Sequence, residues 1–181
     1  MTAARSSSIV RRSARFARGV LRLRTRIGKP RVMVILTLTT MLVLGVVAAP
    51  AAQAGSGHRA RLLRMVNATR SNHDLHRLRM DRSLARDAVR HTRRMIDKNA
   101  IYDPRNLTRI LEDEPWDDVG ASVVGCADTL RGLHRAFMHH AAHRVILLNP
   151  QLRRIGIGVV KVDSQNACGR HWFWTTELFY G

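Results

Sequence analysis

Acidic and aromatic side chains are scarce in this sequence, and cysteine occurs only twice. The 181 residues include 13 Asp or Glu against 31 Lys or Arg, and aromatic residues make up 5%. The cations are scattered and have no aromatic side chains interleaved with them, which disfavours a nucleic-acid-binding surface. The sequence contains neither an internal repeat nor a nucleophile-elbow motif around a serine. Repeat architectures and catalysis of the α/β-hydrolase type are therefore not indicated.

The first 54 residues have the order of a signal peptide. Residues 1–31 contain ten Lys or Arg and no acidic residue, and an uncharged run over 32–49 then leads into Pro-Ala-Ala-Gln-Ala. We therefore predict a basic leader and signal peptide over 1–54, cleaved after Ala54, and a secreted protein. An uncleaved membrane anchor is the alternative, because the uncharged run approaches the length of a membrane span. A twin-arginine signal and a start codon further downstream are weaker alternatives.

Loss of this leader changes the charge of the protein. Ten of the 31 cations lie in it, so residues 55–181 carry 21 cations against 13 acidic residues, a net charge of +8 instead of +18. A basic surface of this size predicts an anionic partner, and the candidates are a lipid or an anionic cell-envelope component. A basic face that is merely solvated is the simpler alternative. Membrane contact is expected only through the signal segment.

The two cysteines, Cys126 and Cys168, both follow the predicted leader. An isolated pair in an exported chain predicts a disulfide bond, which would stabilise a loop of this length by about 4 kcal/mol. Two free buried thiols, or pairing with other chains, remain as alternatives.

Hydrophobic spacing divides the rest of the chain into helices followed by strands. Residues 55–60 contain Gly-Ser-Gly and predict a flexible link to a domain over 61–181. Helical spacing predicts helices over about 59–71, from an N-cap at Asp81 to about Asn99, over 126–139 and over 142–148. Two prolines and a cluster of acids predict a loop over 101–118.

Three short runs predict strands. They cover residues 119–124, 155–162 and 171–179, and a turn over 163–166 joins the last two into a hairpin. Gly156 and Gly158 alternate in the second run, which predicts the close approach of a neighbouring element. Helices first and strands last indicate an α+β domain with a small, largely antiparallel three-stranded sheet covered by helices.

Four segments resemble the CAP superfamily, whose members carry an SCP-like extracellular domain. Val-Asn-Ala-Thr-Arg at 66–70 is similar to the opening helix of bacterial members, and the Leu-x-x-Asp-x-x-Leu-Ala pattern from Leu78 is similar to the start of their second helix. Residues 137–159 resemble their histidine, Asn-Pro and Gly-x-Gly segments, and 172–179 their closing aromatic strand. The resemblance to this cysteine-rich secretory, antigen 5 and pathogenesis-related class implies a secreted α-β-α sandwich. It also implies a binding protein for lipids, metal or envelope components, without agreed catalysis.

The metal cleft of that family is only partly matched. Its members hold a divalent metal with two histidines and one or two glutamates, and His143 matches one histidine. The segment of the second histidine contains Tyr102 and Asp103 here, and Ala121-Ser122 replaces a Glu-Asn pair. Because zinc needs three or four ligands, we predict a degenerate cleft of these five residues with no metal or cofactor.

His139 and His143 have the i, i+4 spacing of zinc-binding helices and are weak metal candidates. The residue after His139 is His140, where such motifs carry a catalytic glutamate. The simpler hypothesis places His143 in the cleft or core, with His139 and His140 facing solvent.

Two functions follow from these patterns. The favoured one is a secreted, non-catalytic binding or cell-envelope interaction module without catalytic residues. Its partner surface would contain Trp172, Trp174, Phe137 and basic side chains. The alternative is a metal-assisted hydrolase that uses His143 with Asp103.

Overall fold

The computed structural model describes residues 9–11, 52–117 and 119–181. Most of the predicted leader, including the uncharged run over 32–49, lies outside the described residues. Among the helices that are described, none is both long and apolar enough to cross a membrane.

A mixed sheet of five strands forms the centre of the domain, in the order β1-β3-β5-β4-β2. Its inner strands β3 (Val119–Ala127), β5 (Trp172–Tyr180) and β4 (Arg154–Val162) are antiparallel, as predicted. At the edges, β1 (Ile9–Arg11) pairs antiparallel with β3, and β2 (Arg79–Met80) pairs parallel with β4. The prediction of three strands was therefore too low, because edge strands of two and three residues are too short to show a period. The α+β class is confirmed.

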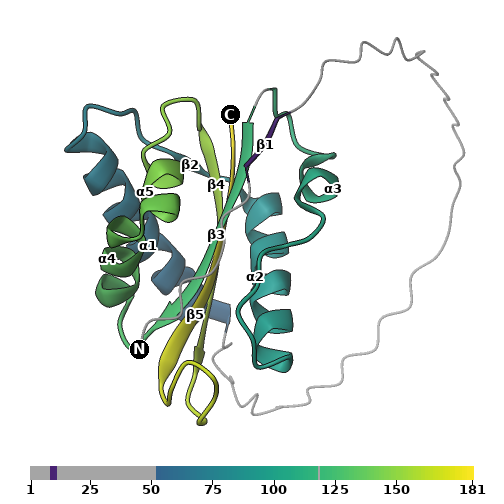
Figure 1. Cartoon of the computed structure of the whole chain (residues 1–181), viewed down its shortest axis with the longest axis vertical. Coiled ribbons are helices and arrows are strands. Elements are labelled where there is room, and N and C mark those ends of the chain that lie inside the picture. The colour runs from purple at the N-terminus through teal and green to yellow at the C-terminus, as the bar shows by residue number, and fades with distance from the viewer. Residues whose placement is uncertain (1–8, 12–51, 118) are drawn as a thin grey trace, which may run out of the picture. The chain divides into compact units, whose positions relative to one another are not determined.

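Helices cover both faces of this sheet (Figure 1). On one face lie α1 (Ala52–Ser71), α4 (Leu130–His139) and α5 (Ala141–Leu147). On the other lie α2 (Arg82–Asp97) and the short α3 (Leu107–Leu111). The larger apolar core lies under α1, α4 and α5, and a second cluster joins α2 and α3 to β5.

Close packing of α2 on the sheet depends on two glycines. Asp81 caps α2, since its side chain accepts a hydrogen bond from the Leu84 amide at 3.0 Å. A Cβ added at Gly156 would collide with the backbone of Leu84, and one added at Gly158 with the backbone of Ala88. The predicted N-cap and the predicted close approach are both confirmed.

Three local predictions were wrong. Residues 55–60 are not a flexible link but part of α1. Glycine lowers helix stability, but burial of Leu62 and Val66 of the same helix in the core offsets this loss. The strand β3 continues through Cys126 to Ala127, and α4 begins only at Leu130. Every position of β3 is buried, so it lacks the alternation that marks a half-exposed strand. The predicted loop over 101–118 contains α3.

Two polar residues of the 66–70 segment have structural roles. Asn67 bonds to both the amide and the carbonyl of Leu78, at 2.8 and 3.0 Å. Arg70 is completely buried, and its guanidinium donates to the carbonyls of His76 (2.9 Å), Leu147 (2.9 Å) and Asn149 (3.0 Å). Arg70 thus ties the C-terminal end of α5 to the segment after α1.

Replacing Arg70 with methionine should destabilise the domain by about 3 kcal/mol. Methionine fills a similar volume, but it leaves three carbonyls without their donor. Urea denaturation of the variant measures the loss, and Arg64→Met on the exposed side of α1 is the control. An Arg70→Met variant as stable as the control would show that these bonds contribute nothing net.

Candidate functional site

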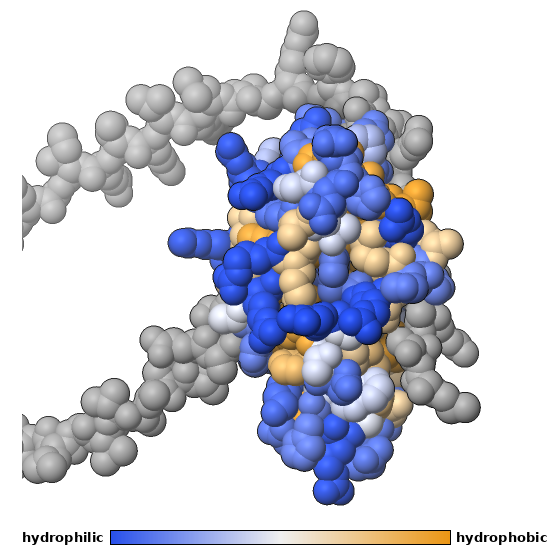
Figure 2. Space-filling model, turned by 90° about the vertical axis from the view of Figure 1, so that its left-hand side faces the viewer, coloured by the Kyte–Doolittle hydropathy of each residue, from blue (hydrophilic) through white to orange (hydrophobic). Residues whose placement is uncertain are grey.

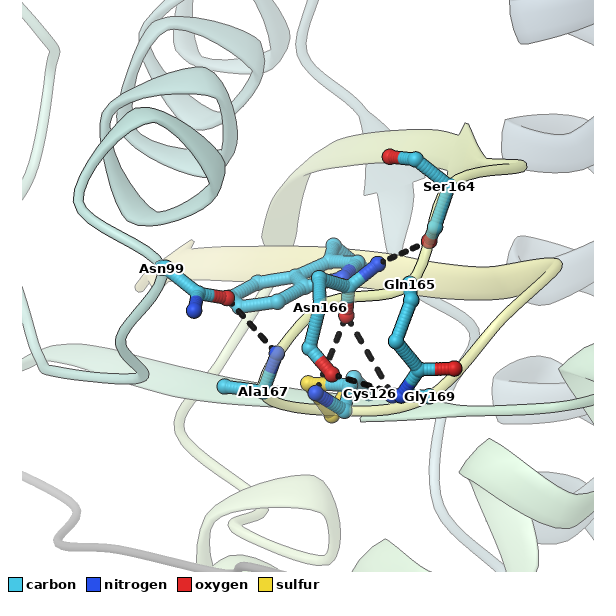
Figure 3. The surroundings of a disulfide bond; sticks show 9 residues. Asn99, Cys126, Ser164, Gln165, Asn166, Ala167 and Gly169 are labelled. Atoms are coloured by element: carbon cyan, nitrogen blue, oxygen red, sulfur yellow. Dashed lines mark hydrogen bonds between the residues drawn. A yellow bond between two sulfur atoms is a disulfide. The ribbon is translucent and has the colours of Figure 1, made fainter.

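The predicted disulfide between Cys126 and Cys168 is confirmed, with a Cα–Cα distance of 6.2 Å. It joins β3 to the loop between β4 and β5 (Figure 3). Asn166 organises this loop through its side-chain oxygen, which accepts from the Cys168 amide (2.9 Å) and from Trp174 Nε1 (3.2 Å). The loop is therefore tied to the sheet by both covalent and polar contacts.

A buried histidine that sequence reasoning missed lies on the α2 face of the sheet. His91 Nδ1 is 3.1 Å from the Thr176 hydroxyl, and its ring meets Tyr102 edge to face at 5.2 Å. Burial, and to a lesser degree the charge of Arg94, lower the pKa of His91 to about 4. The imidazole is thus neutral at pH 7. Its position on the buried stripe of α2, seven residues after Leu84, is the signal that could have identified it.

Three of the five predicted cleft residues lie on this α2 face. Tyr102 contacts His91, and the Ser122 hydroxyl donates to Asp103 Oδ1 at 3.1 Å. Ser122 is opposite Leu178 in the β3–β5 register, and Leu178 packs with Leu84 of α2. This group forms a polar cluster beneath the segment that follows α2.

The other two predicted cleft residues belong to the opposite helical layer. Ala121 is part of the core under α4 and α5, because neighbouring residues of a strand point to opposite faces. His143 is completely buried, with its ring 5.1 Å from that of Phe137 and 4.5 Å from that of His140. The structure thus divides the predicted cleft into two groups, and His143 and Asp103 belong to different ones.

The helix predicted to carry His139 and His143 on one face is interrupted. The segment α4 ends at His139, and His140 has φ −90° and ψ 114°, outside the helical region. His139 is exposed, whereas His140 is half-buried against His143 rather than in solvent. Within the described residues, no three His, Cys, Asp or Glu side chains are grouped to hold a metal ion. The donors at the family's cleft positions therefore do not fit zinc, which takes three or four ligands.

The predicted aromatic partner surface is wrong. Trp174 is 0% exposed and Phe137 2% exposed, and Trp172 is half-buried. These aromatic side chains pack in the core, so the basic residues remain as the candidate binding surface.

Seven arginines line two cavities at β2, and we call them the β2 basic surface. A cavity of about 420 Å³ lies between α1 and α2, with an apolar floor that includes Leu63 and Met80. A second cavity of about 430 Å³ lies at β2 and β4. In the described part of the chain, none of these guanidiniums lies within 4 Å of a carboxylate. The seven residues are Arg59, Arg77, Arg79, Arg82, Arg86, Arg153 and Arg154.

By contrast, another cavity is lined by side chains of both charge signs. Between α2 and α3, Asp87 and Asp113 line a cavity together with Arg90, Arg94 and Arg109. On the face formed by α1, α4 and α5, strongly hydrophilic side chains border apolar ones (Figure 2). The β2 basic surface is thus distinguished by two cavities whose described lining contains arginines and no Asp or Glu.

Solved structures of bacterial extracellular domains share this fold. An outer surface protein from Borrelia burgdorferi aligns with a TM-score of 0.59 and 16% identity, over 68% of this chain and 92% of that one. A cysteine-rich secretory protein from Staphylococcus aureus gives 0.56 and 18%, over 73% and 40%. An extracellular SCP-domain protein from Bacillus anthracis gives 0.53 and 22%, over 71% and 42%. The chain spans about two-fifths of the last two proteins. No curated protein matches its sequence.

A five-stranded sheet between two helical layers, tied by one disulfide, places this chain among the α-β-α sandwich domains of SCP type. The profile of the cysteine-rich secretory protein family, CAP, matches residues 63–178. The chain belongs to this family, and the resemblance of its four sequence segments is confirmed.

Proposed function

We propose that this protein is a secreted, non-catalytic module that binds an anionic component of the cell envelope through the β2 basic surface. The observation that carries the proposal is that seven arginines, and no Asp or Glu among the described residues, line the two cavities at β2. Guanidinium groups with no acidic side chain among them create a positive potential that attracts polyanions. Charge pairing within the domain would have cancelled that potential.

Export is the second part of the proposal and rests on the predicted leader over 1–54. The structures with the same fold include proteins described as extracellular and as an outer surface protein, which supports a similar location. Cleavage after Ala54 would remove β1 together with the first three residues of α1. A leader that stays attached would instead anchor the domain to the membrane.

The arrangement of the histidines and acids supports a binding role over hydrolysis. His143 packs with Phe137 in the α4 and α5 layer, whereas the Asp103 carboxylate accepts a hydrogen bond from Ser122 on the α2 face. A metal-assisted hydrolase needs such groups to converge on one reacting atom. Ala121, at a family glutamate position, contributes no ligand at all.

The purified protein should sediment with vesicles containing phosphatidylglycerol and not with pure phosphatidylcholine vesicles, and added salt should weaken the binding. Exchanging Arg59, Arg82 and Arg86 for glutamine should reduce binding about tenfold. The matched control exchanges Arg90, Arg94 and Arg109 for glutamine, which removes the same charge from the cavity between α2 and α3.

The proposed export is tested separately. The intact mass of the protein recovered from culture medium shows whether residues 1–54 have been removed.

Two results would contradict the proposal. Equal loss of binding in both triple variants would show that net charge, rather than the β2 basic surface, attracts the vesicles. Stoichiometric zinc that is lost on His143→Ala would favour the metal-assisted hydrolase instead.

A further inference from the structure

Four members of the β2 basic surface line the cavity at β2 and β4. They are Arg77, Arg79, Arg153 and Arg154, and the cavity measures about 430 Å³. Arg79 and Arg154 are directly paired in the parallel register of the two strands. Their side chains therefore leave the same face of neighbouring strands, about 4.8 Å apart at the backbone.

Such a pair is unfavourable when nothing lies between the charges. Like charges at paired positions of a sheet destabilise it, and no carboxylate lies within 4 Å of either guanidinium in the described residues. The acid nearest in sequence, Asp81, already accepts bonds from the Leu84 amide and the Tyr180 hydroxyl. Burial raises the pKa of the Asp81 carboxyl, the hydrogen bonds from Leu84 and Tyr180 lower it, and the charge of Arg154 is the smallest of the causes that lower it. An external anion would relieve the repulsion that the protein leaves unbalanced.

A third guanidinium is held in place by polar contacts. Arg153 Nη1 donates to the Pro150 carbonyl and lies 3.2 Å from His76 Nδ1. Arg153 Nη1 also lies 2.6 Å from His76 Nε2, which is itself 2.5 Å from the Leu152 carbonyl, and Arg153 Nη1 is 3.3 Å from that carbonyl. The side chain of Arg153 is thus oriented before any ligand binds, which lowers the entropic cost of binding.

We propose that this cavity is a phosphate-binding site. A guanidinium fork matches phosphate oxygens two at a time. A carboxylate offers two oxygens and one charge, too few for four guanidiniums, whereas a phosphate group offers more acceptor oxygens and up to about two charges. The proposal rests on the proposed envelope binding and specifies the chemical group that is recognised. A lipid headgroup or a phosphate-containing envelope polymer could present that group.

Calorimetry with sodium phosphate, compared with sodium acetate at equal ionic strength, tests the site in the purified protein. We expect phosphate to bind and to raise the Tm, and acetate to do neither. Arg79→Gln/Arg154→Gln should lower phosphate affinity about tenfold without lowering the Tm, because the like-charge pair is removed. Arg90→Gln/Arg94→Gln is the matched control and should bind phosphate as the parent does.

Two further probes distinguish the possible sources of the phosphate group: phosphatidylglycerol vesicles represent a lipid headgroup, and glycerol phosphate represents a phosphate-containing envelope polymer. Binding of vesicles alone identifies a headgroup ligand, and binding of both supports a phosphate site open to polymers. Equal affinity for acetate and phosphate would overturn the proposal, as would unchanged phosphate binding in Arg79→Gln/Arg154→Gln. If the protein binds phosphate but binds neither vesicles nor envelope preparations, the proposed envelope function is refuted and the phosphate-binding site is retained. If the protein does not bind phosphate, but envelope binding persists in Arg79→Gln/Arg154→Gln, the phosphate site is refuted and the proposed envelope function is retained.

Discussion

Replacing Glu177 with glutamine should make the protein more stable at pH 8.5 and leave its stability nearly unchanged at pH 5. Glu177 lies on β5, paired with Val123 and Ile157, both of which are fully buried. Its own side chain is completely buried, and neither carboxyl oxygen has a hydrogen-bond partner within the described residues. Burial therefore raises the pKa of Glu177 to about 8, so that the acid is protonated in the folded protein at pH 7.

The sign of the pH dependence follows from proton binding. Between the usual pKa of about 4.5 and the raised value of about 8, the folded state keeps a proton that the unfolded state releases. The free energy of unfolding therefore falls as pH rises through this window, by about 3–5 kcal/mol in total. Glutamine is neutral at every pH and removes this loss.

Urea denaturation at pH 6.5 and 8.5 isolates the contribution of Glu177. His91 has the opposite sign, because its lowered pKa makes stability rise with pH, but only up to about pH 6.5. Above that pH, wild type should lose about 2 kcal/mol that Glu177→Gln retains. The exposed Glu112→Gln is the control and should follow wild type. If the free energy of unfolding changed equally with pH in wild type and Glu177→Gln, the result would show that the Glu177 carboxyl ionises in the folded protein with little loss of stability.

The parts of the fold that were predictable have strong local patterns. The helix α2 carries its buried residues at helical spacing behind an N-cap aspartate, and both features are visible in the sequence. The β4–β5 hairpin was predicted to within about one residue at either strand, because its aromatic and β-branched runs are long. The spaced glycines of β4 indicated the helix that packs on them.

Elements defined by distant partners could not be predicted. The two-residue β2 exists because it pairs with β4, and nothing in Arg79-Met80 alone indicates a strand. In the same way, Cys126 looks helical next to the residues of α4, yet its pairing with Trp174 makes it part of β3. Tertiary contacts override local propensity at both positions.

The candidate site shows the same limit. Alignment with a family pattern grouped His143, Asp103, Ala121 and Ser122 by sequence order, but strand geometry sends Ala121 and Ser122 to opposite faces. The arginines were visible only as scattered cations, because no sequence period connects Arg59 with Arg154. Their convergence on β2 depends on the arrangement of α1, α2 and β4 around one sheet edge.

Removal of the disulfide should have an equally large effect on stability. Cys126 and Cys168 are 42 residues apart, and in the chain-entropy model a loop of this length contributes about 4 kcal/mol by restricting the unfolded chain. Cys126→Ala/Cys168→Ala should therefore unfold at a clearly lower urea concentration than wild type. Dithiothreitol should lower the midpoint of wild type to that of the variant and leave the variant unchanged.

The folded structure around the bridge should nevertheless persist in the reduced protein. Asn166 still accepts hydrogen bonds from the Cys168 amide and Trp174, and Asn99 still accepts one from the Ala167 amide at 2.6 Å. Vesicle and phosphate binding at the β2 basic surface should consequently be retained below the unfolding transition, since the described residues that line its two cavities include none from the bridged loop. Loss of phosphate binding in folded Cys126→Ala/Cys168→Ala would show instead that the bridge organises the distant sheet edge. We therefore expect the disulfide to maintain the fold and the arginines at β2 to bind the anionic partner that we propose.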